Sequence, residues 1–166
     1  LVDGISSVGA TYIEMEKWGI DVVVTASQKA LMAPAGLTII TASDRALEIA
    51  RENIKSNYYF NFNKMQTAVK EGMTTYTPAL PSLFGLCKAV QLFHEEGLIN
   101  VYKRHKVLSK KCRDGLVELG LKLFAVEGYA SPTVTSILMP EKYPASLIRE
   151  KLEAEHNVFV ARGRAN

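Results

Sequence analysis

Two residues of this chain, an acid and an amine, each follow an apolar run that has the character of a buried strand. Asp3 follows Leu1 and Val2, and Lys29 comes shortly after the β-branched run VVVT at positions 22–25. Apolar runs that do not alternate with polar residues are typical of strands covered on both faces, as in a parallel sheet. Ligands of open α/β sheets bind outside the carboxyl ends of the strands, so Asp3 and Lys29 are predicted to share one crevice.

The residues around Lys29 favour a chemical role for its amine. Thr25, Ser27 and Gln28 place hydroxyl and amide groups close by, and no carboxylate stands beside the lysine in the sequence. An amine that acts as a nucleophile must spend time uncharged, which is easiest where no carboxylate pairs with it. The spacing alone leaves an alternative open: a solvated lysine after a strand, and a turn-forming aspartate before Gly4.

Four segments resemble the class V aminotransferases: VDGISSVG at 2–9, WGIDVVV at 18–24, SQKAL at 27–31 and PAGL at 34–37. The similarity is to the alanine–glyoxylate and serine–glyoxylate (serine–pyruvate) branch, whose members are fold-type-I pyridoxal-phosphate enzymes. It implies an α/β fold with part of the large-domain mixed sheet and its flanking helices, followed by a small α+β C-terminal domain. We place the division between residues 1–100 and 101–166.

The same resemblance implies roles for five residues around a pyridoxal 5'-phosphate cofactor. Lys29 would form the Schiff base, Asp3 would face the pyridine nitrogen, and Ile5 would pack on the ring. Ser27 and Gln28 would lie near the phosphate. Lys29 would then move a proton between the substrate and the cofactor, and an ionised Asp3 would keep the ring an electron sink.

Thr77 is implied to reach the cofactor phosphate of the neighbouring subunit, so the expected protein is a homodimer. The alternative is plain capping, because Thr77 and Pro78 suit the N-cap and N1 positions of a helix. Members of the family often carry an aromatic residue a few positions earlier. Thr74 stands in that place, and Tyr76 is the nearest aromatic substitute.

The expected reaction moves an amino group from a small amino acid, alanine or serine, to a 2-oxo acid, glyoxylate or pyruvate. Phosphoserine aminotransferase, another class V enzyme and a non-catalytic scaffold protein are the alternatives. Gln28 stands where the cysteine desulfurases carry a histidine, which disfavours desulfuration. The family's phosphate-binding loop and ring-stacking aromatic are not located, and neither Arg162 nor Arg164 is assigned to the substrate carboxylate. The chain is therefore interpreted as an incomplete piece that is inactive alone.

Composition narrows the class of protein without identifying it. The 166 residues carry a net charge of +3 and 22% charged residues, which is ordinary for a globular protein. The basic residues at 103–113 are interpreted as a solvated helix face, and no nucleic acid is expected, because no aromatic residues are interleaved with them. No apolar run reaches membrane-spanning length, so we expect a cytoplasmic protein without a membrane partner.

Cysteines and histidines offer no metal site. His94, His105 and His156 are too far apart for ligand spacing, so no metal is expected. Cys87 and Cys112 are expected to be reduced and packed, with a disulfide as the open alternative.

Periodicity and capping signals predict the remaining elements. Helices are expected over 10–19, 43–53, 82–96, 99–119 and 145–155, and strands over 37–41, 121–126, 133–139 and 158–161. The turn PAG at 34–36 predicts an antiparallel return strand. The aromatic residues YYF at 58–60, in the least regular stretch, suit a short strand, a subunit contact or an ordinary loop. Residues expected to face inward from the helices are Leu47, Ile49, Ala50, Leu83, Leu86, Cys87, Val90, Phe93, Val101, Leu108, Cys112, Leu116 and Leu119.

Overall fold

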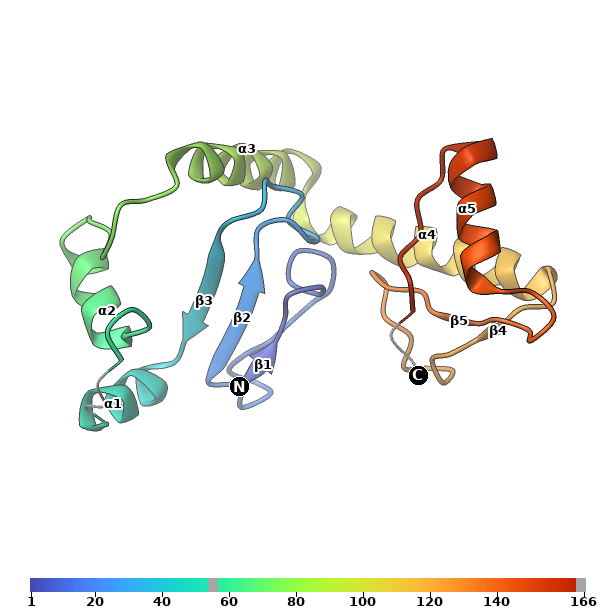
Figure 1. Ribbon diagram of the computed structural model, residues 1–166. Coiled ribbons are helices and arrows are strands. Elements are labelled where there is room, and N and C mark those ends of the chain that lie inside the picture. Colours follow the sequence, from blue (N-terminus) through green and yellow to red (C-terminus); the bar gives the residue numbers. More distant parts are fainter. Residues whose placement is uncertain (54–56, 164–166) are drawn as a thin grey trace. The chain divides into compact units, whose positions relative to one another are not determined.

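The structure, a computed structural model, describes residues 1–53 and 57–163, so Arg164 lies outside the described residues. The chain divides into two compact units, Leu1–Lys103 and Arg104–Asn166, and each is described by itself (Figure 1).

A three-stranded mixed sheet forms the centre of the first unit. Its strands are β1 (Val2–Asp3), β2 (Val22–Ala26) and β3 (Thr38–Ala42), in the order β1-β2-β3. β1 pairs with β2 in parallel, and β2 pairs with β3 antiparallel, as the sequence predicted. The central strand buries alternate side chains, because successive residues of a strand point to opposite faces.

The connection from β1 to β2 contains no α-helix, so the helix predicted over 10–19 is wrong. Residues 14–18 form a single helical turn, in which Trp18 N–H donates to the carbonyl of Glu14 at 3.0 Å. Gly19 follows with a φ of 62°, a left-handed conformation that ends a helical turn. A single turn recovers too few hydrogen bonds to propagate, because helix nucleation is costly.

Four helices continue the chain: α1 (Asp44–Glu52), α2 (Phe62–Lys70), α3 (Leu80–Glu96) and α4 (Leu98–Glu118). α2 was not predicted, and Tyr58 to Phe60, for which a strand was one option, form bends before it. Ala79 is the N-cap of α3, so the prediction that Thr77 caps this helix is wrong. Pro81 within the first turn explains the later start, because a helix tolerates proline there.

The second unit has short strands and one further helix. β4 (Lys122–Leu123) pairs antiparallel with β5 (Ile137–Leu138), and α5 spans Ala145–His156. The strand predicted over 158–161 is wrong, because this segment lies outside any ladder among the described residues. Arg149 instead donates from Nε to the carbonyl of Val160 at 3.1 Å.

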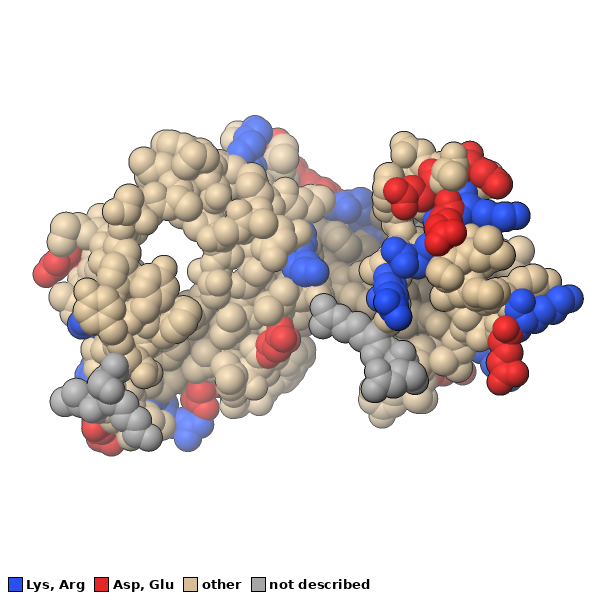
Figure 2. Space-filling model, viewed as in Figure 1, with Lys and Arg blue, Asp and Glu red and all other residues tan. Residues whose placement is uncertain are grey.

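Charges of both signs are interspersed on the visible face of the second unit (Figure 2). Lys110 pairs with Asp114 at 2.6 Å on α4, and Arg113 donates to the carbonyl of Ser131 at 3.1 Å. The exposed pair agrees with a solvated helix face, whereas the part-buried Arg113 attaches α4 to the segment at Ser131.

Few side chains are buried within the described residues. The apolar ones are Ala10, Val23, Ala33, Ala89, Phe93 and Val101. Several residues predicted to face inward are exposed instead, and the prediction is wrong for Ile49, Cys87, Val90, Leu108, Cys112 and Leu119. Periodicity identifies the apolar face of a helix, but it does not reveal whether another element covers that face. Both cysteines are free thiols, as predicted, but they are exposed and not packed.

α3 packs closely on the turn that precedes β3. A Cβ atom added at Gly85 would lie 2.6 Å from Cδ of Pro34, and Ser82 donates from Oγ to the carbonyl of Ala35 at 3.4 Å. Only a residue without a side chain therefore lets the helix approach Pro34 this closely.

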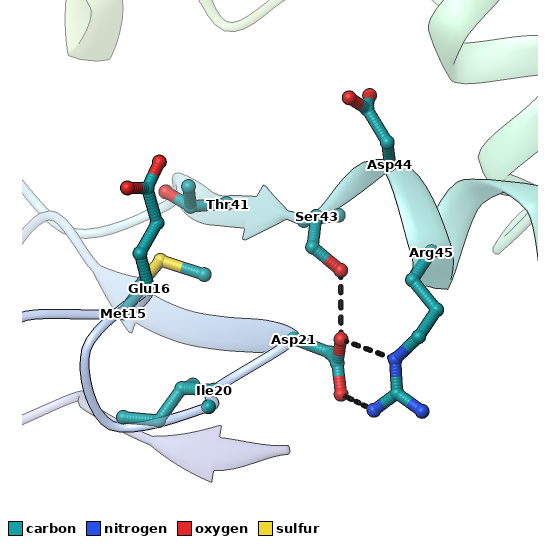
Figure 3. A pocket seen from close by; sticks show the side chains of 10 residues that line it. Met15, Glu16, Ile20, Asp21, Thr41, Ser43, Asp44 and Arg45 are labelled. Atoms are coloured by element: carbon teal, nitrogen blue, oxygen red, sulfur yellow. Dashed lines mark hydrogen bonds and ion pairs between the residues drawn. The ribbon is translucent and has the colours of Figure 1, made fainter.

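Asp21 ties the segment before β2 to the start of α1 (Figure 3). Its Oδ1 accepts hydrogen bonds from Ser43 Oγ at 2.9 Å and Arg45 Nε at 3.0 Å, and Arg45 Nη2 donates to Oδ2. Ser43 is also the N-cap of α1, where its Oγ accepts from Ala46 N–H at 3.2 Å. The Arg45 guanidinium first, and then the Ser43 hydroxyl, lower the pKa of the Asp21 carboxyl.

We expect Asp21→Asn to lower stability in a pH-dependent way. A carboxyl whose folded-state pKa is lowered stabilises the protein above its unfolded pKa of about 3.9, and this contribution disappears as the pH falls through the lowered value. The difference in free energy of unfolding between wild type and variant should thus be largest near neutral pH and shrink below about pH 4. Urea unfolding at several pH values measures it.

Asp44→Asn is the matched control, because Asp44 lines the same hollow without a hydrogen bond or ion pair among the described residues. It should lower stability less than Asp21→Asn does at pH 7. An equal loss in both variants would contradict the interaction.

Gly85→Ala should destabilise the protein by about 1–3 kcal/mol, because the new methyl group would overlap Pro34. Gly115→Ala is the control: it lies in helix α4 with nothing within 4 Å of an added Cβ. Alanine there should be neutral or stabilise by up to about 1 kcal/mol. Thermal unfolding compares the two, and similar effects would show that Gly85 tolerates a side chain.

Candidate active site

Asp3 and Lys29 lie at the same edge of the sheet. β1 and β2 run parallel with Asp3 opposite Val24, and Gly4 N–H continues the ladder to the Val24 carbonyl at 2.8 Å. Asp3 ends β1, and Lys29 comes three residues after Ala26, the last residue of β2. Both side chains are exposed. The carboxyl ends of two adjacent parallel strands therefore bring an acid and an amine to one edge of the sheet. The crevice that they were predicted to share stays a prediction.

The carboxylate of Asp3 is held on one side only. Its Oδ1 accepts a hydrogen bond from Ile5 N–H at 2.9 Å, a local turn that fixes the side chain. The other oxygen makes no hydrogen bond within the described residues and can accept one from a ligand. Ile5 itself is half-buried. Gly4 allows the chain to turn here, since a Cβ would lie 2.8 Å from Val8 and 2.9 Å from Val23.

Lys29 starts a tight turn within a longer loop, residues 27–37, which we call the Lys29 loop. Met32 N–H donates to the Lys29 carbonyl at 2.9 Å, and Met32 adopts a φ of 54°, which is unusual for a side chain of its size. Within the described residues the Lys29 ammonium makes no hydrogen bond or ion pair. Its amine is therefore available to a ligand.

Ser27 closes the Lys29 loop from inside, whereas Gln28 faces solvent. The Ser27 side chain is 0% exposed, and its Oγ donates to the Pro34 carbonyl at 2.6 Å and accepts from Leu37 N–H at 3.3 Å. Gln28 is exposed, and among the described residues its side-chain amide forms no hydrogen bond. The two residues that the sequence predicted near a phosphate thus differ sharply in what they can donate.

The turn after Asp3 and the Lys29 loop are packed together. A Cβ at Gly9, whose φ is 95°, would lie 2.9 Å from Leu31 and 3.4 Å from Phe93 of α3. Gly9 and Gly85 are positions that sequence reasoning missed. The signal for Gly85 was a glycine inside a helical pattern, which often marks close packing.

Thr77 is not joined to the other predicted site residues. It is exposed, and its hydroxyl forms no hydrogen bond among the described residues. The nearby Thr74 donates to the carbonyl of Tyr76 at 2.7 Å, and the Tyr76 ring stacks on that of Tyr59 with centroids 4.6 Å apart.

The one hollow that we describe lies at the other end of β2. It measures about 540 Å³ and surrounds Asp21, which precedes β2, whereas Lys29 follows this strand. The polar groups that Asp21, Ser43 and Arg45 direct into it already bond to one another, so it is a structural feature (Figure 3). In the described part of the chain no cluster of three or more His, Cys, Asp or Glu could hold a metal. Nor is any described helix both long and apolar enough to cross a membrane.

Comparison with known proteins identifies the family. The family model for class-V aminotransferases matches residues 1–165. An uncharacterized aminotransferase of Methanocaldococcus jannaschii is 40% identical, over 99% of this chain and 43% of that protein. A serine–glyoxylate aminotransferase of Methylorubrum extorquens is 38% identical, over 98% and 42%.

Solved structures agree with this match. An alanine–glyoxylate aminotransferase from Nostoc sp. superposes with a TM-score of 0.92 at 28% identity, over 99% of this chain and 44% of that one. The chain thus spans less than half the length of the relatives it matches. Its fold is part of the fold-type-I pyridoxal-phosphate transferase fold, as predicted. The match over nearly every residue places the chain in the class-V aminotransferase family.

Proposed function

We propose that the whole protein is a pyridoxal-phosphate-dependent aminotransferase in which Lys29 carries the cofactor. One observation carries this proposal: parallel pairing of β1 with β2 brings Asp3 and Lys29 to one sheet edge, both exposed and each with a free polar group.

The chemistry of the two side chains suits opposite ends of the cofactor. The free oxygen of Asp3 suits a protonated pyridine nitrogen, because a carboxylate strengthens a hydrogen bond from a charged donor. The unpaired amine of Lys29 suits an aldehyde carbon. Ile5, half-buried beside Asp3, offers an apolar surface to the ring, and exposed Gln28 has amide protons for the phosphate. When bound, pyridoxal phosphate supplies an electron sink for a carbanion.

Each residue then has a defined task in transamination. Lys29 would hold the cofactor through its amine, and this amine, once released by the substrate, would take up the proton from the substrate Cα and give it back, acting as base and then acid. Asp3 would face the pyridine nitrogen, where its negative charge would favour the protonated ring. The preferred donors are alanine or serine, and the preferred acceptors are glyoxylate or pyruvate, since serine–glyoxylate aminotransferases are 38% identical to this chain. Phosphoserine aminotransferase is disfavoured, because the sequence identity to the solved structure of such an enzyme is only 22%, so that likeness shows the fold alone.

We further infer a cytoplasmic homodimer that shares the cofactor site. Thr77 stands on the connection between α2 and α3, and an opening through the first unit separates this side from the sheet (Figure 2). Its free hydroxyl is therefore more suited to a second subunit than to Lys29 of its own chain. Tyr58, Tyr59 and Phe60, which are 75%, 55% and 75% exposed, supply an aromatic surface near it for subunit contact. We keep residues 1–100 as the large-domain part and 101–166 as the small-domain part.

Borohydride reduction of the full-length protein with pyridoxal phosphate should fix a pyridoxyl group on Lys29, which peptide mass spectrometry would locate. Lys29→Ala should remove this label and the transaminase activity together. Asp3→Ala should keep the label and lower the rate of transamination about 100-fold or more, since charge stabilisation at the ring is lost.

Lys17→Ala is the matched control, because Lys17 pairs with Glu14 at 3.0 Å and should not affect labelling of Lys29. A wild-type protein labelled elsewhere but not at Lys29 would refute the assignment, and would favour a non-catalytic scaffold.

Thr77→Val should weaken binding of pyridoxal phosphate about tenfold or more without changing the dimer, since a hydrogen bond to a charged group is lost. Mixed dimers test the sharing directly. With Lys29→Ala and Thr77→Val in different subunits, the remaining Lys29 site should bind the cofactor normally. With both changes in one subunit, the remaining Lys29 site would face the Thr77→Val change, and its affinity for the cofactor should fall. Equal affinity in the two mixed dimers, or a monomeric protein, would contradict the proposal.

A further inference from the structure

The geometry points to Ser27 as a positioning residue that holds the Lys29 loop closed, rather than as a ligand of the cofactor phosphate. This inference deepens the proposed function and rests on it for the role of Lys29. The part of the inference that concerns the shape of the loop depends only on the buried hydrogen bonds of Ser27.

The first argument is the supply of protons on the Ser27 hydroxyl. A serine hydroxyl has one proton to donate and two lone pairs to accept with. The proton is already given to the Pro34 carbonyl at 2.6 Å, and one lone pair receives Leu37 N–H at 3.3 Å. A phosphate oxygen can only accept, so it would have to take the proton that Pro34 holds. Since the side chain is 0% exposed, the phosphate would also have to enter a closed site.

The second argument is that Ser27 bonds across the neck of the loop with its backbone as well. Its N–H donates to the Leu37 carbonyl at 3.1 Å, and its carbonyl accepts from Ala33 N–H at 3.0 Å. Together with the side chain, these make four hydrogen bonds between one residue and the far side of the loop. A single buried residue therefore fixes both ends of the segment that contains Lys29.

The third argument is that Lys29 has no support of its own. Its ammonium makes no hydrogen bond among the described residues, so the direction of the side chain depends on the backbone turn between Lys29 and Met32. The loop is braced at Pro34 by the close approach of Gly85 and at Leu31 by that of Gly9, since a Cβ added at these glycines would lie 2.6 Å and 2.9 Å away. Ser27 supplies the polar part of this support, and without it Pro34 O and Leu37 N–H would lose their side-chain partner.

Ser27 and Gln28 therefore have different roles. Gln28 is exposed, and its side-chain amide is unbonded within the described residues, so it has donors to offer a phosphate. Ser27 has none left. Removing the Ser27 side chain should therefore change the position of Lys29 and its reaction with every ligand. Removing the Gln28 side chain should change the reaction only with ligands that carry a phosphate.

Two measurements on the full-length protein test this. In the cofactor-free form, Ser27→Ala should speed hydrogen–deuterium exchange in the peptide containing Ala33 and Leu37 about tenfold, since local opening becomes easier. In the second, borohydride labelling of Lys29 is timed with pyridoxal and with pyridoxal phosphate. Ser27→Ala should slow labelling by the same factor for both aldehydes, whereas Gln28→Ala should slow it only for pyridoxal phosphate.

Ser82→Ala is the matched control, because the Ser82 hydroxyl also bonds to a carbonyl of this loop, but at 3.4 Å and from outside. It should change exchange less than twofold. If Ser27→Ala does not fold, Ser27→Cys keeps a side chain of the same shape with a weaker donor and should show an effect of the same kind.

Unchanged exchange in both Ser27 variants, or slower labelling only with pyridoxal phosphate, would overturn the inference. If neither aldehyde labels Lys29 in the wild type, the proposed cofactor role fails, and the exchange experiment still decides the role of Ser27.

Discussion

Parallel pairing between β1 and β2 is the constraint on which the rest of the first unit depends. It is short, with Val2 opposite Val23 and Asp3 opposite Val24, and is extended only by the Gly4 N–H. Yet this pairing decides that two residues far apart in the sequence reach the same edge. Antiparallel pairing would have sent the chain after Asp3 to the opposite end of β2. The chemistry that we propose therefore depends on strand direction before it depends on any side chain.

Close contacts at three glycines turn this pairing into a firm support. Gly4 lets the chain fold over Val23, Gly9 lets the first turn rest on Leu31, and Gly85 lets α3 rest on Pro34. In each case an added Cβ would lie within 3 Å of a neighbouring side chain. Backbone that approaches so closely leaves little room for the turns to move. An exposed lysine without a bonding partner needs such a rigid backbone to hold its position.

The sequence allowed prediction of features that depend on local pattern. Unbroken β-branched residues predicted a parallel β2, and the turn at 34–36 predicted the antiparallel β3, because both signals act over a few residues. The strand at 158–161 was wrong for a physical reason: β propensity measures how well side chains fit a sheet and cannot supply a neighbouring strand. Helix α2 was missed although Asn61 caps it through Lys64 N–H at 3.0 Å, since the aromatic residues before it suggested an irregular segment.

The site was predictable in part for the same reason. The common edge of Asp3 and Lys29 follows from strand order, but the partner of the Ser27 hydroxyl does not. It depends on where Pro34 and Leu37 come to lie after the loop has turned, and a sequence motif records only that a hydroxyl is present.

β2 is fastened at both of its ends, by Asp21 to Arg45 before it and by Ser27 to Leu37 after it. Sliding the strand by one residue would reverse which side chains face inward and would break both attachments at once. The register of β2 therefore cannot shift gradually, and loss of its pairing with the neighbouring strands must be cooperative. The backbone of a lysine that follows such a strand closely is therefore held in a fixed position relative to the sheet.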